Sequence, residues 1–329
     1  MFATTMSFSY VSTFSGAGGL DLGLERTGFE PVSFCEIEKD FCDSLHANQG
    51  WKHIDGNTYF GDAPIINADI REVSTNELLV GNKSVDLVVG GPPCQAFSSS
   101  GKQLSVLDPR GVLVEEFARV IDEIKPKMFL FENVRGIVTS RDRSGVPGGV
   151  ITGLINRFED VGYSVRACLL NAADYGSFQR RVRCFLIASK NGVAPEIPPF
   201  THTKNSDLFL PKWRSLREFL ELYSDKTKEN FVFPTTILGK QLNALPDGSG
   251  LKSPGRKEPT RPGGHWGYRQ GTFISDLELP ARTITGASSQ DWIRWDGLLR
   301  RLTMNEISQL QGFPEDWIFK GTKSGQLSK

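Results

Sequence analysis

Short apolar segments alternate with amphipathic segments of helical length through the first 190 residues, and this alternation limits the possible folds more than any other feature. Phe8–Phe14 is rich in aromatic and β-branched residues, and Val85–Val89 is a continuous apolar run typical of a strand buried on both faces. Lys39–Ala47 and Ile151–Val161 instead repeat apolar residues at helical spacing. Strands separated by helices predict a parallel sheet with crossover connections, and therefore an α/β domain with helices on both faces of the sheet.

The pattern changes between residues 190 and 275. Nine prolines interrupt this region, glycines cluster at 248–271, and regular periodicity is weak apart from a short helix expected at Ser215–Tyr223. We therefore expect a first domain at 1–189, a smaller loop-rich domain at 190–275 and a return to the first domain at 276–329.

The composition excludes several classes of protein. Apolar residues make up 39% and charged residues 23% of the 329 residues, which is typical of a folded chain. No apolar run approaches the roughly 20 residues that span a bilayer, so we expect no contact with a membrane. The five cysteines show neither a paired framework nor a metal-binding spacing, which predicts no bound metal and a reducing, intracellular compartment.

The charge is balanced overall but not along the chain. Residues 1–140 contain 11 basic and 19 acidic side chains, whereas residues 141–329 contain 27 and 19. Such a separation favours a face that binds a polyanion, although a solvated charged surface explains it equally well.

A glycine-rich turn, Ser15-Gly-Ala-Gly-Gly19, lies between the first expected strand and a helix. Glycines allow the backbone to approach a ligand, and a helix N-terminus offers free N–H groups. Glu36 ends the second expected strand, where a carboxylate can accept from a ribose diol, and Asp69 follows the next strand, where it could accept from an adenine amino group. These residues predict an adenosine cofactor but do not separate a dinucleotide from S-adenosylmethionine.

Cys94 directly follows a buried strand and two prolines, in the sequence Gly90-Gly-Pro-Pro-Cys-Gln95. Open α/β sheets bind ligands at the carboxyl ends of their strands, so a thiol held rigidly there is a candidate nucleophile. The Ser- and Gly-rich stretch that follows, to about Val106, has the composition of a lid. The other four cysteines are expected to be small buried hydrophobic residues.

Several further motifs follow in a fixed order along the chain. They are Phe14-Ser-Gly-Ala-Gly-Gly19, Pro92-Pro-Cys-Gln95, Asp108-Pro-Arg-Gly111, Phe131-Glu-Asn-Val134, Gln179-Arg-Arg-Val-Arg183, Arg282-Thr-Ile284 and Gln311-Gly-Phe-Pro314. Together they resemble the DNA cytosine-5 methyltransferase family, in its compact bacterial or phage restriction–modification form. The resemblance covers almost the whole chain outside 190–275, which corresponds to the family's target-recognition region.

This resemblance implies a Rossmann-like sheet typical of S-adenosylmethionine-dependent methyltransferases, and the production of 5-methylcytosine in a specific double-stranded DNA sequence after base flipping. The cofactor would be S-adenosyl-L-methionine, released as S-adenosyl-L-homocysteine. The implied catalytic residues are Cys94, which adds to C6 of the base, Glu132, which stabilises N3, and Arg181 and Arg183, of which Arg183 contacts the ring carbonyl oxygen.

The resemblance also assigns binding residues. Those expected to hold the cofactor are Phe14, Ser15, Gly16, Ala17, Gly18, Gly19, Leu20, Glu36, Ile37, Asp69, Ile70, Gly91 and Pro92. Those expected to contact DNA are Gln95, Ser98, Ser100, Arg110, Arg256, Arg261, Arg269 and Thr283.

Three alternatives stay open. The transfer-RNA-methylating branch of the same family is the first, although the region 190–275 contains no Cys-Phe-Thr, a tripeptide typical of that branch. A non-catalytic DNA-binding subunit is the second, because the family's glycine-asparagine-valine segment would begin where this sequence stops, so that a second polypeptide could supply it. A dinucleotide oxidoreductase is the third. The restriction–modification form further implies a cognate restriction endonuclease as partner, and a place in the bacterial cytoplasm near the nucleoid.

Overall fold

The computed structural model describes residues 7–93, 111–142, 144–205, 208–252, 268–284 and 290–321. The chain divides into two compact units, each of which is described by itself. Unit 1 comprises Met1–Leu170, Val182–Pro198 and Asp316–Gly321, and unit 2 comprises Asn171–Arg181, Pro199–Glu315 and Thr322–Lys329. These limits differ from the expected ones, because residues 171–181 and 276–315 pack with the proline-rich region and not with the sheet.

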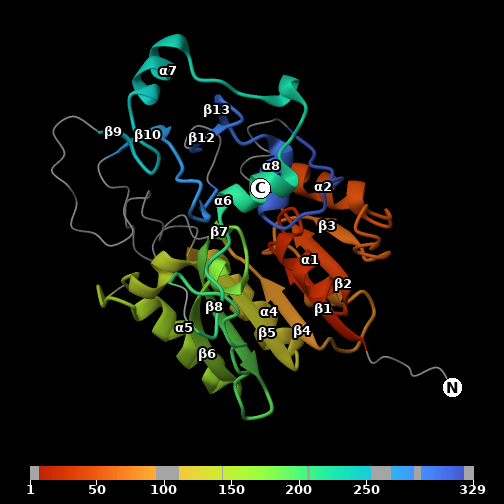
Figure 1. Cartoon of the computed structure of the whole chain (residues 1–329). Helices are drawn as coiled ribbons and strands as arrows, with labels where there is room; N and C mark the ends of the chain where they lie inside the picture. Colours follow the sequence, from red (N-terminus) through yellow and green to blue (C-terminus); the bar gives the residue numbers. More distant parts are fainter. Residues whose placement is uncertain are drawn as a thin grey trace. The chain divides into compact units, whose positions relative to one another are not determined.

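Unit 1 contains a seven-stranded sheet in the order β3-β2-β1-β4-β5-β8-β6 (Figure 1). The strands are β1 (Phe8–Thr13), β2 (Phe29–Glu36), β3 (Ile65–Asn67), β4 (Leu87–Gly90), β5 (Met128–Val134), β6 (Ser164–Asn171) and β8 (Val182–Ser189). The first five pair in parallel, whereas β8 is antiparallel to β5. The predicted α/β fold is confirmed, although the sheet is not parallel throughout.

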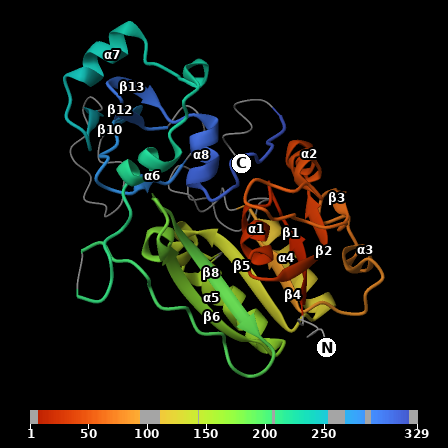
Figure 2. The same ribbon diagram turned by 45° about the vertical axis from the view of Figure 1, so that its right-hand side comes forward.

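Helices cover both faces of this sheet. They are α1 (Gly19–Glu25), α2 (Lys39–Asn48), α3 (Thr75–Leu79), α4 (Gly111–Ile124) and α5 (Gly149–Asp160), with a 3-10 turn η1 (Arg135–Thr139) after β5. Figures 1 and 2 both show α5 alongside β6 and β8. Successive residues of a strand point to opposite faces of the sheet. Val11 of β1 therefore joins the core under α3, α4 and α5. Tyr10 points to the other face, where its hydroxyl donates to Glu25 of α1 at 3.1 Å.

The segment Asp316–Gly321 belongs to unit 1, although it lies near the end of the chain. The side-chain amide of Asn48 donates to the carbonyl of Ile318 at 2.8 Å and accepts from its N–H at 2.9 Å. Asp316 lies 3.1 Å from Nδ1 of His53, and Trp317 stacks on the His53 ring with centroids 5.1 Å apart. These contacts hold the segment against the C-terminal end of α2 and the loop after it.

Unit 2 combines short helices with two-stranded ribbons. Its elements are η2 (Ala172–Tyr175), β7 (Gln179–Arg180), α6 (Leu216–Tyr223), η3 (Lys228–Asn230), α7 (Thr236–Asn243), β9 (Gly250–Lys252), β10 (Tyr268–Phe273), β11 (Ala281–Arg282), β12 (Trp292–Trp295), β13 (Leu298–Arg301) and α8 (Met304–Leu310). One apolar cluster joins α6, β12 and α8 through Phe219, Ile293 and Leu310, and a second joins α7 to Trp292. The helix expected at Ser215–Tyr223 is confirmed.

A buried ion pair fixes α8 to the strand before it. The guanidinium of Arg300 makes two hydrogen bonds of 2.7 Å to Glu306, and both side chains are almost fully buried. Glu306 also accepts from the N–H of Thr303 as part of the helix capping box. Among the residues described in both units, no helix is long and apolar enough to cross a membrane.

Candidate active site

The predicted site residues of unit 1 that the structure describes lie at one edge of the sheet. The glycine turn follows β1, Glu36 ends β2, Gly91 follows β4, and Glu132 lies near the end of β5. Because these strands are parallel, their carboxyl ends meet at the same edge. Arg183 lies at the start of the antiparallel β8, opposite Val134, which brings it to this edge as well.

The glycine turn depends on backbone conformations that favour glycine. Gly16 and Gly18 have φ values of 55° and 84°. A Cβ at Gly18 would lie 2.6 Å from the Phe60 ring and 2.8 Å from Leu45, whereas a Cβ at Gly16 would meet no atom within 4 Å. Gly18 is therefore needed for packing, while Gly16 leaves open space beside the turn.

Glu36 links this turn to the second strand. Its two carboxylate oxygens accept from the N–H of Gly16 at 2.8 Å and from the N–H of Glu38 at 2.9 Å. Burial raises its pKa, which these backbone hydrogen bonds partly offset. The neighbouring Ile37 is an apolar side chain that is 58% exposed. A carboxylate has about four acceptor sites, so Glu36 can still accept from a diol.

Asn67, at the end of β3, supports this arrangement, and Asp69, which follows that strand, supplies an ionised carboxylate. The side-chain amide of Asn67 donates to the carbonyls of Glu36 and Ile37, at 3.1 and 2.9 Å. Asp69 accepts from the guanidinium of Arg71, and this ion pair lowers the pKa of Asp69. Ile70 is buried in the core, so its side chain is not available to a ligand.

The chain's own residues at this edge fit an adenosine cofactor. A buried carboxylate with spare acceptor capacity lies beside an exposed apolar side chain, which suits a ribose next to an adenine ring. The open space at Gly16 suits the close approach of a ligand to the backbone.

The end of β5 is attached to the segment that leads to Cys94. The amide of Asn133 donates to the carbonyl of Pro92 at 3.1 Å, and its side-chain oxygen accepts from the N–H of Val134 at 2.8 Å. Asn133 is 2% exposed. A Cβ at Gly91 would lie 3.2 Å from Oε2 of Glu132, so that carboxylate lies against the backbone of the same segment.

Glu132 and Arg183 form an ion pair. Nε of Arg183 lies 3.0 Å from Oε1 of Glu132, and both side chains are mostly buried. Burial lowers the pKa of Arg183, and the adjacent Glu132 carboxylate partly offsets this lowering. Arg183 therefore holds one oxygen of Glu132, while the other faces Gly91.

Several predicted residues lie outside the part of the chain that is described. They are Cys94, Gln95, Ser98, Ser100, Arg110, Arg256 and Arg261. Of the four cysteines that are described, Cys35, Cys42 and Cys184 are buried as expected, and Cys168 is half-buried. Burial raises the pKa of all four thiols, to about 12, 11 and 12 for the three buried ones. Within the described ranges no thiol has the lowered pKa of a nucleophile.

The remaining predicted residues fall in unit 2. Arg181 lies between β7 and β8 and belongs to unit 2. Its carbonyl accepts from the N–H of Ala172 at 3.0 Å. The hydroxyl of Thr283 donates to the carbonyl of Arg180 at 2.7 Å. Arg269 is exposed on β10.

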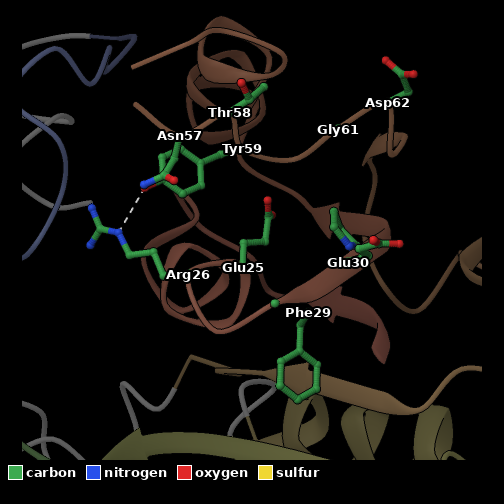
Figure 3. Close-up of a pocket in the computed structure, with 11 residues that line it drawn as sticks. Glu25, Arg26, Phe29, Glu30, Asn57, Thr58, Tyr59, Gly61 and Asp62 are labelled. Carbon is green, nitrogen blue, oxygen red and sulfur yellow. Dashed lines mark hydrogen bonds between the residues drawn. The ribbon is translucent and has the colours of Figure 1, made fainter. Parts of the chain in front are cut away.

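Figure 3 shows a pocket of about 610 Å³ elsewhere in unit 1, between the end of α1, the start of β2 and the segment 57–62. Glu25, Arg26 and Tyr59 line it, and Nε of Arg26 donates to the Tyr59 hydroxyl at 3.1 Å. The carboxylate of Glu25 accepts from the N–H of Phe60, and burial raises its pKa to about 7. None of the predicted site residues lines this pocket.

Sequence reasoning missed two positioning residues. Asn133 lies within the motif Phe131-Glu-Asn-Val134, but nothing in the sequence indicates that its amide reaches Pro92, 41 residues earlier. Asn67 carries no motif. Its only signal is its place at the end of a short apolar run, next to the expected Asp69.

Comparison with known proteins identifies the relatives of this chain. Residues 8–329 match the model of the C-5 cytosine-specific DNA methylase family. The Type II methyltransferase M1.HphI of Haemophilus parahaemolyticus is 33% identical over 98% of this chain and 82% of its own length. M.FnuDI of Fusobacterium nucleatum, another Type II methyltransferase, is 30% identical over 94% and 85%. The crystal structure of the S. pombe Dnmt2 methyltransferase shares the fold, with a TM-score of 0.65 at 14% identity over 98% of this chain and 93% of its own.

The chain therefore belongs to the C-5 cytosine-specific DNA methylase family. It is a DNA cytosine-5 methyltransferase that uses S-adenosylmethionine as its methyl donor.

Proposed function

We propose that this methyltransferase modifies a specific duplex sequence by covalent catalysis, with Cys94 as nucleophile and Glu132 and Arg183 as the residues that hold the flipped base. One observation carries the proposal. The Glu132–Arg183 pair lies against Gly91, and Asn133 holds the carbonyl of Pro92, two residues before Cys94. Glu132, Arg183 and the backbone that leads to Cys94 thus lie at neighbouring strand ends.

Cys94 overcomes the poor nucleophilicity of C5. Its thiolate adds to C6 of cytosine, and the electrons of the C5–C6 double bond make C5 nucleophilic. After C5 has gained the methyl group, loss of its proton expels the thiolate and restores the ring. A positive charge near the thiol would favour the thiolate form.

Glu132 and Arg183 stabilise the charge that addition creates on the base. A proton shared between the Glu132 carboxyl and N3 neutralises that ring nitrogen. The Arg183 guanidinium has donors beyond its Nε contact with Glu132, and these can reach the ring carbonyl oxygen. Arg181, two residues before Arg183 in the same motif, is the residue assigned to support this pocket.

The glycine turn and the ends of β2 and β3 hold the cofactor. Glu36 accepts from the ribose, Ile37 packs on the adenine, and Asp69 accepts from its amino group. S-adenosylmethionine, when bound, supplies an electrophilic methyl group. The site is completed by Phe14, Ser15, Ala17, Gly19, Leu20 and the backbone of Ile70, Gly91 and Pro92.

The DNA contacts come from residues inside and outside the described regions. Cytosine is extruded from the duplex at a cost of a few kcal/mol, which contacts to the backbone offset. In the cell, the relatives' Type II character supports a modification role in the bacterial cytoplasm, near the nucleoid, alongside a restriction endonuclease. The residues assigned to the DNA contacts are Gln95, Ser98, Ser100, Arg110, Arg256, Arg261, Arg269 and Thr283.

A trapping assay tests the reaction. The protein is incubated with S-adenosylmethionine and mixed-sequence duplex DNA that contains 5-fluorocytosine, because fluorine at C5 blocks the final elimination. We expect a covalent adduct that Cys94→Ala abolishes and that the matched variant Cys168→Ala retains. An adduct that survives Cys94→Ala would reject the nucleophile. Methyl transfer to transfer RNA and not to duplex DNA would reject the substrate.

A further inference from the structure

Phe60 has a strained backbone conformation beside the glycine turn. Its φ is 68°, in the left-handed region that residues with a bulky side chain enter only at a cost. The carboxylate of Glu25 accepts from the N–H of Phe60 at 2.7 Å, and the carbonyl of Phe60 accepts from the N–H of Ala63 at 3.2 Å. These hydrogen bonds hold the backbone in this conformation, and strain that the surroundings maintain in this way is concentrated at functional sites.

This backbone conformation places the Phe60 ring against the glycine turn. The ring is fully buried, and a Cβ at Gly18 would lie only 2.6 Å from its Cζ. The N–H of Gly18 closes the turn by donating to the carbonyl of Ser15 at 3.0 Å. Gly16, inside the turn, donates to Glu36 at 2.8 Å. The position of the ring therefore limits where the turn can lie, and the turn in turn fixes the Glu36 carboxylate.

A residue from much later in the chain packs on the same ring. The indole of Trp317 meets the Phe60 ring edge to face, with the ring centroids 5.5 Å apart and the planes at 90°. Trp317 is 6% exposed, and the contacts of its segment, Asp316–Gly321, with Asn48 and His53 hold it in place. Edge-to-face aromatic pairs stabilise each other beyond the burial of their surface. A continuous line of contacts thus leads from this late segment to the glycine turn.

We propose that Phe60 and Trp317, which we call the aromatic prop, are positioning residues that set the affinity for S-adenosylmethionine through the glycine turn. The inference rests on the proposed cofactor site, in which the turn and Glu36 hold the adenosine. A smaller side chain at position 60 leaves space beside Gly18, toward which the turn can relax. The hydrogen bond from Gly16 to Glu36 then loses its geometry, and the carboxylate loses its position for the ribose.

Calorimetric titration with S-adenosylmethionine tests the aromatic prop against a matched control. Phe60→Leu and Phe158→Leu each replace a fully buried phenylalanine of unit 1, and Phe158 packs on Phe129 in the core under α5, with ring centroids 4.4 Å apart. Both variants should lose comparable stability. We expect Phe60→Leu to raise the dissociation constant about tenfold and Phe158→Leu to leave it within about twofold, at a temperature where both are folded. The single-turnover rate at saturating cofactor should stay within about twofold of the wild type in both.

Trp317 provides a second test that does not depend on the folding of Phe60→Leu. Trp317→Leu should weaken cofactor binding several-fold, and Trp317→Phe, which keeps an aromatic ring, should restore most of the affinity. Wild-type affinity in Phe60→Leu, an equal loss in Phe158→Leu, or wild-type affinity in Trp317→Leu would overturn the proposal.

Glu36→Ala distinguishes a failure of the aromatic prop from a failure of the proposed cofactor site. Cofactor affinity that survives Glu36→Ala would reject the site at the glycine turn, and the aromatic prop with it. Affinity that is lost in Glu36→Ala but retained in Phe60→Leu would reject the aromatic prop alone.

Discussion

Replacing Asn133 with alanine should slow methyl transfer more than it weakens cofactor binding. The side chain makes two hydrogen bonds, to the carbonyl of Pro92 at 3.1 Å and from the N–H of Val134 at 2.8 Å. Each contributes about 1 kcal/mol, and the carbonyl of the buried Pro92 would lose its partner. We expect the free energy of unfolding to fall by about 2–3 kcal/mol.

The effect on the rate follows from the position of this contact. Asn133 holds the backbone two residues before Cys94, and a displacement of about 1 Å at a reacting group can cost about a hundredfold in rate. We expect kcat to fall between about ten- and a hundredfold, measured as single-turnover methyl transfer to unmethylated genomic DNA at a temperature where the variant is folded. The dissociation constant for S-adenosylmethionine, measured by calorimetry, should rise by less than the rate falls, because Pro92 contributes only backbone to the cofactor site.

Asn67→Ala is the matched control, because its amide supports Glu36 and Ile37 at the cofactor end of the same sheet edge. It should weaken cofactor binding and leave the single-turnover rate at saturating cofactor almost unchanged. A folded Asn133→Ala protein with wild-type kcat, or one that loses cofactor affinity as Asn67→Ala does, would refute the reasoning.

Three further predictions follow from the same structure. Gly91→Ala places a Cβ 3.2 Å from Oε2 of Glu132, so methyl transfer should fall at least about tenfold, whereas Gly153→Ala, whose Cβ meets nothing within 4 Å on a helix, should raise the melting temperature and leave the rate unchanged. Burial raises the pKa of Asp21 from 3.8 to about 7, so its contribution to stability is complete below about pH 4 and is lost as the pH rises through 7. Asp21→Asn should therefore be more stable than the wild type at about pH 8, by up to about 4 kcal/mol in denaturant titration, and equal stability there would contradict the burial argument. Iodoacetamide at neutral pH should label Cys94 before any other thiol, and mass spectrometry that finds another cysteine labelled first would count against its assignment.

The sequence by itself determined the local elements of this protein. Apolar runs and helical spacing located the strands at 8–14 and 85–89 and the helices at 39–47 and 151–161, because these patterns depend on residues that are near neighbours in the chain. The glycine turn and Glu36 were also found this way, since each lies at the end of a strand and the ends of parallel strands meet. Glu132 was instead implied by the family resemblance, through the motif Phe131-Glu-Asn-Val134.

Only the tertiary structure decided which distant residues meet. Arg180 and Arg183 are three residues apart, yet one faces Arg282 on a ribbon of unit 2 and the other pairs with Glu132 in unit 1. Asn133 reaches Pro92 only because β4 and β5 are adjacent in the sheet. Sequence periodicity contains no information on such pairings, because they depend on the order and direction of strands, which long-range packing sets.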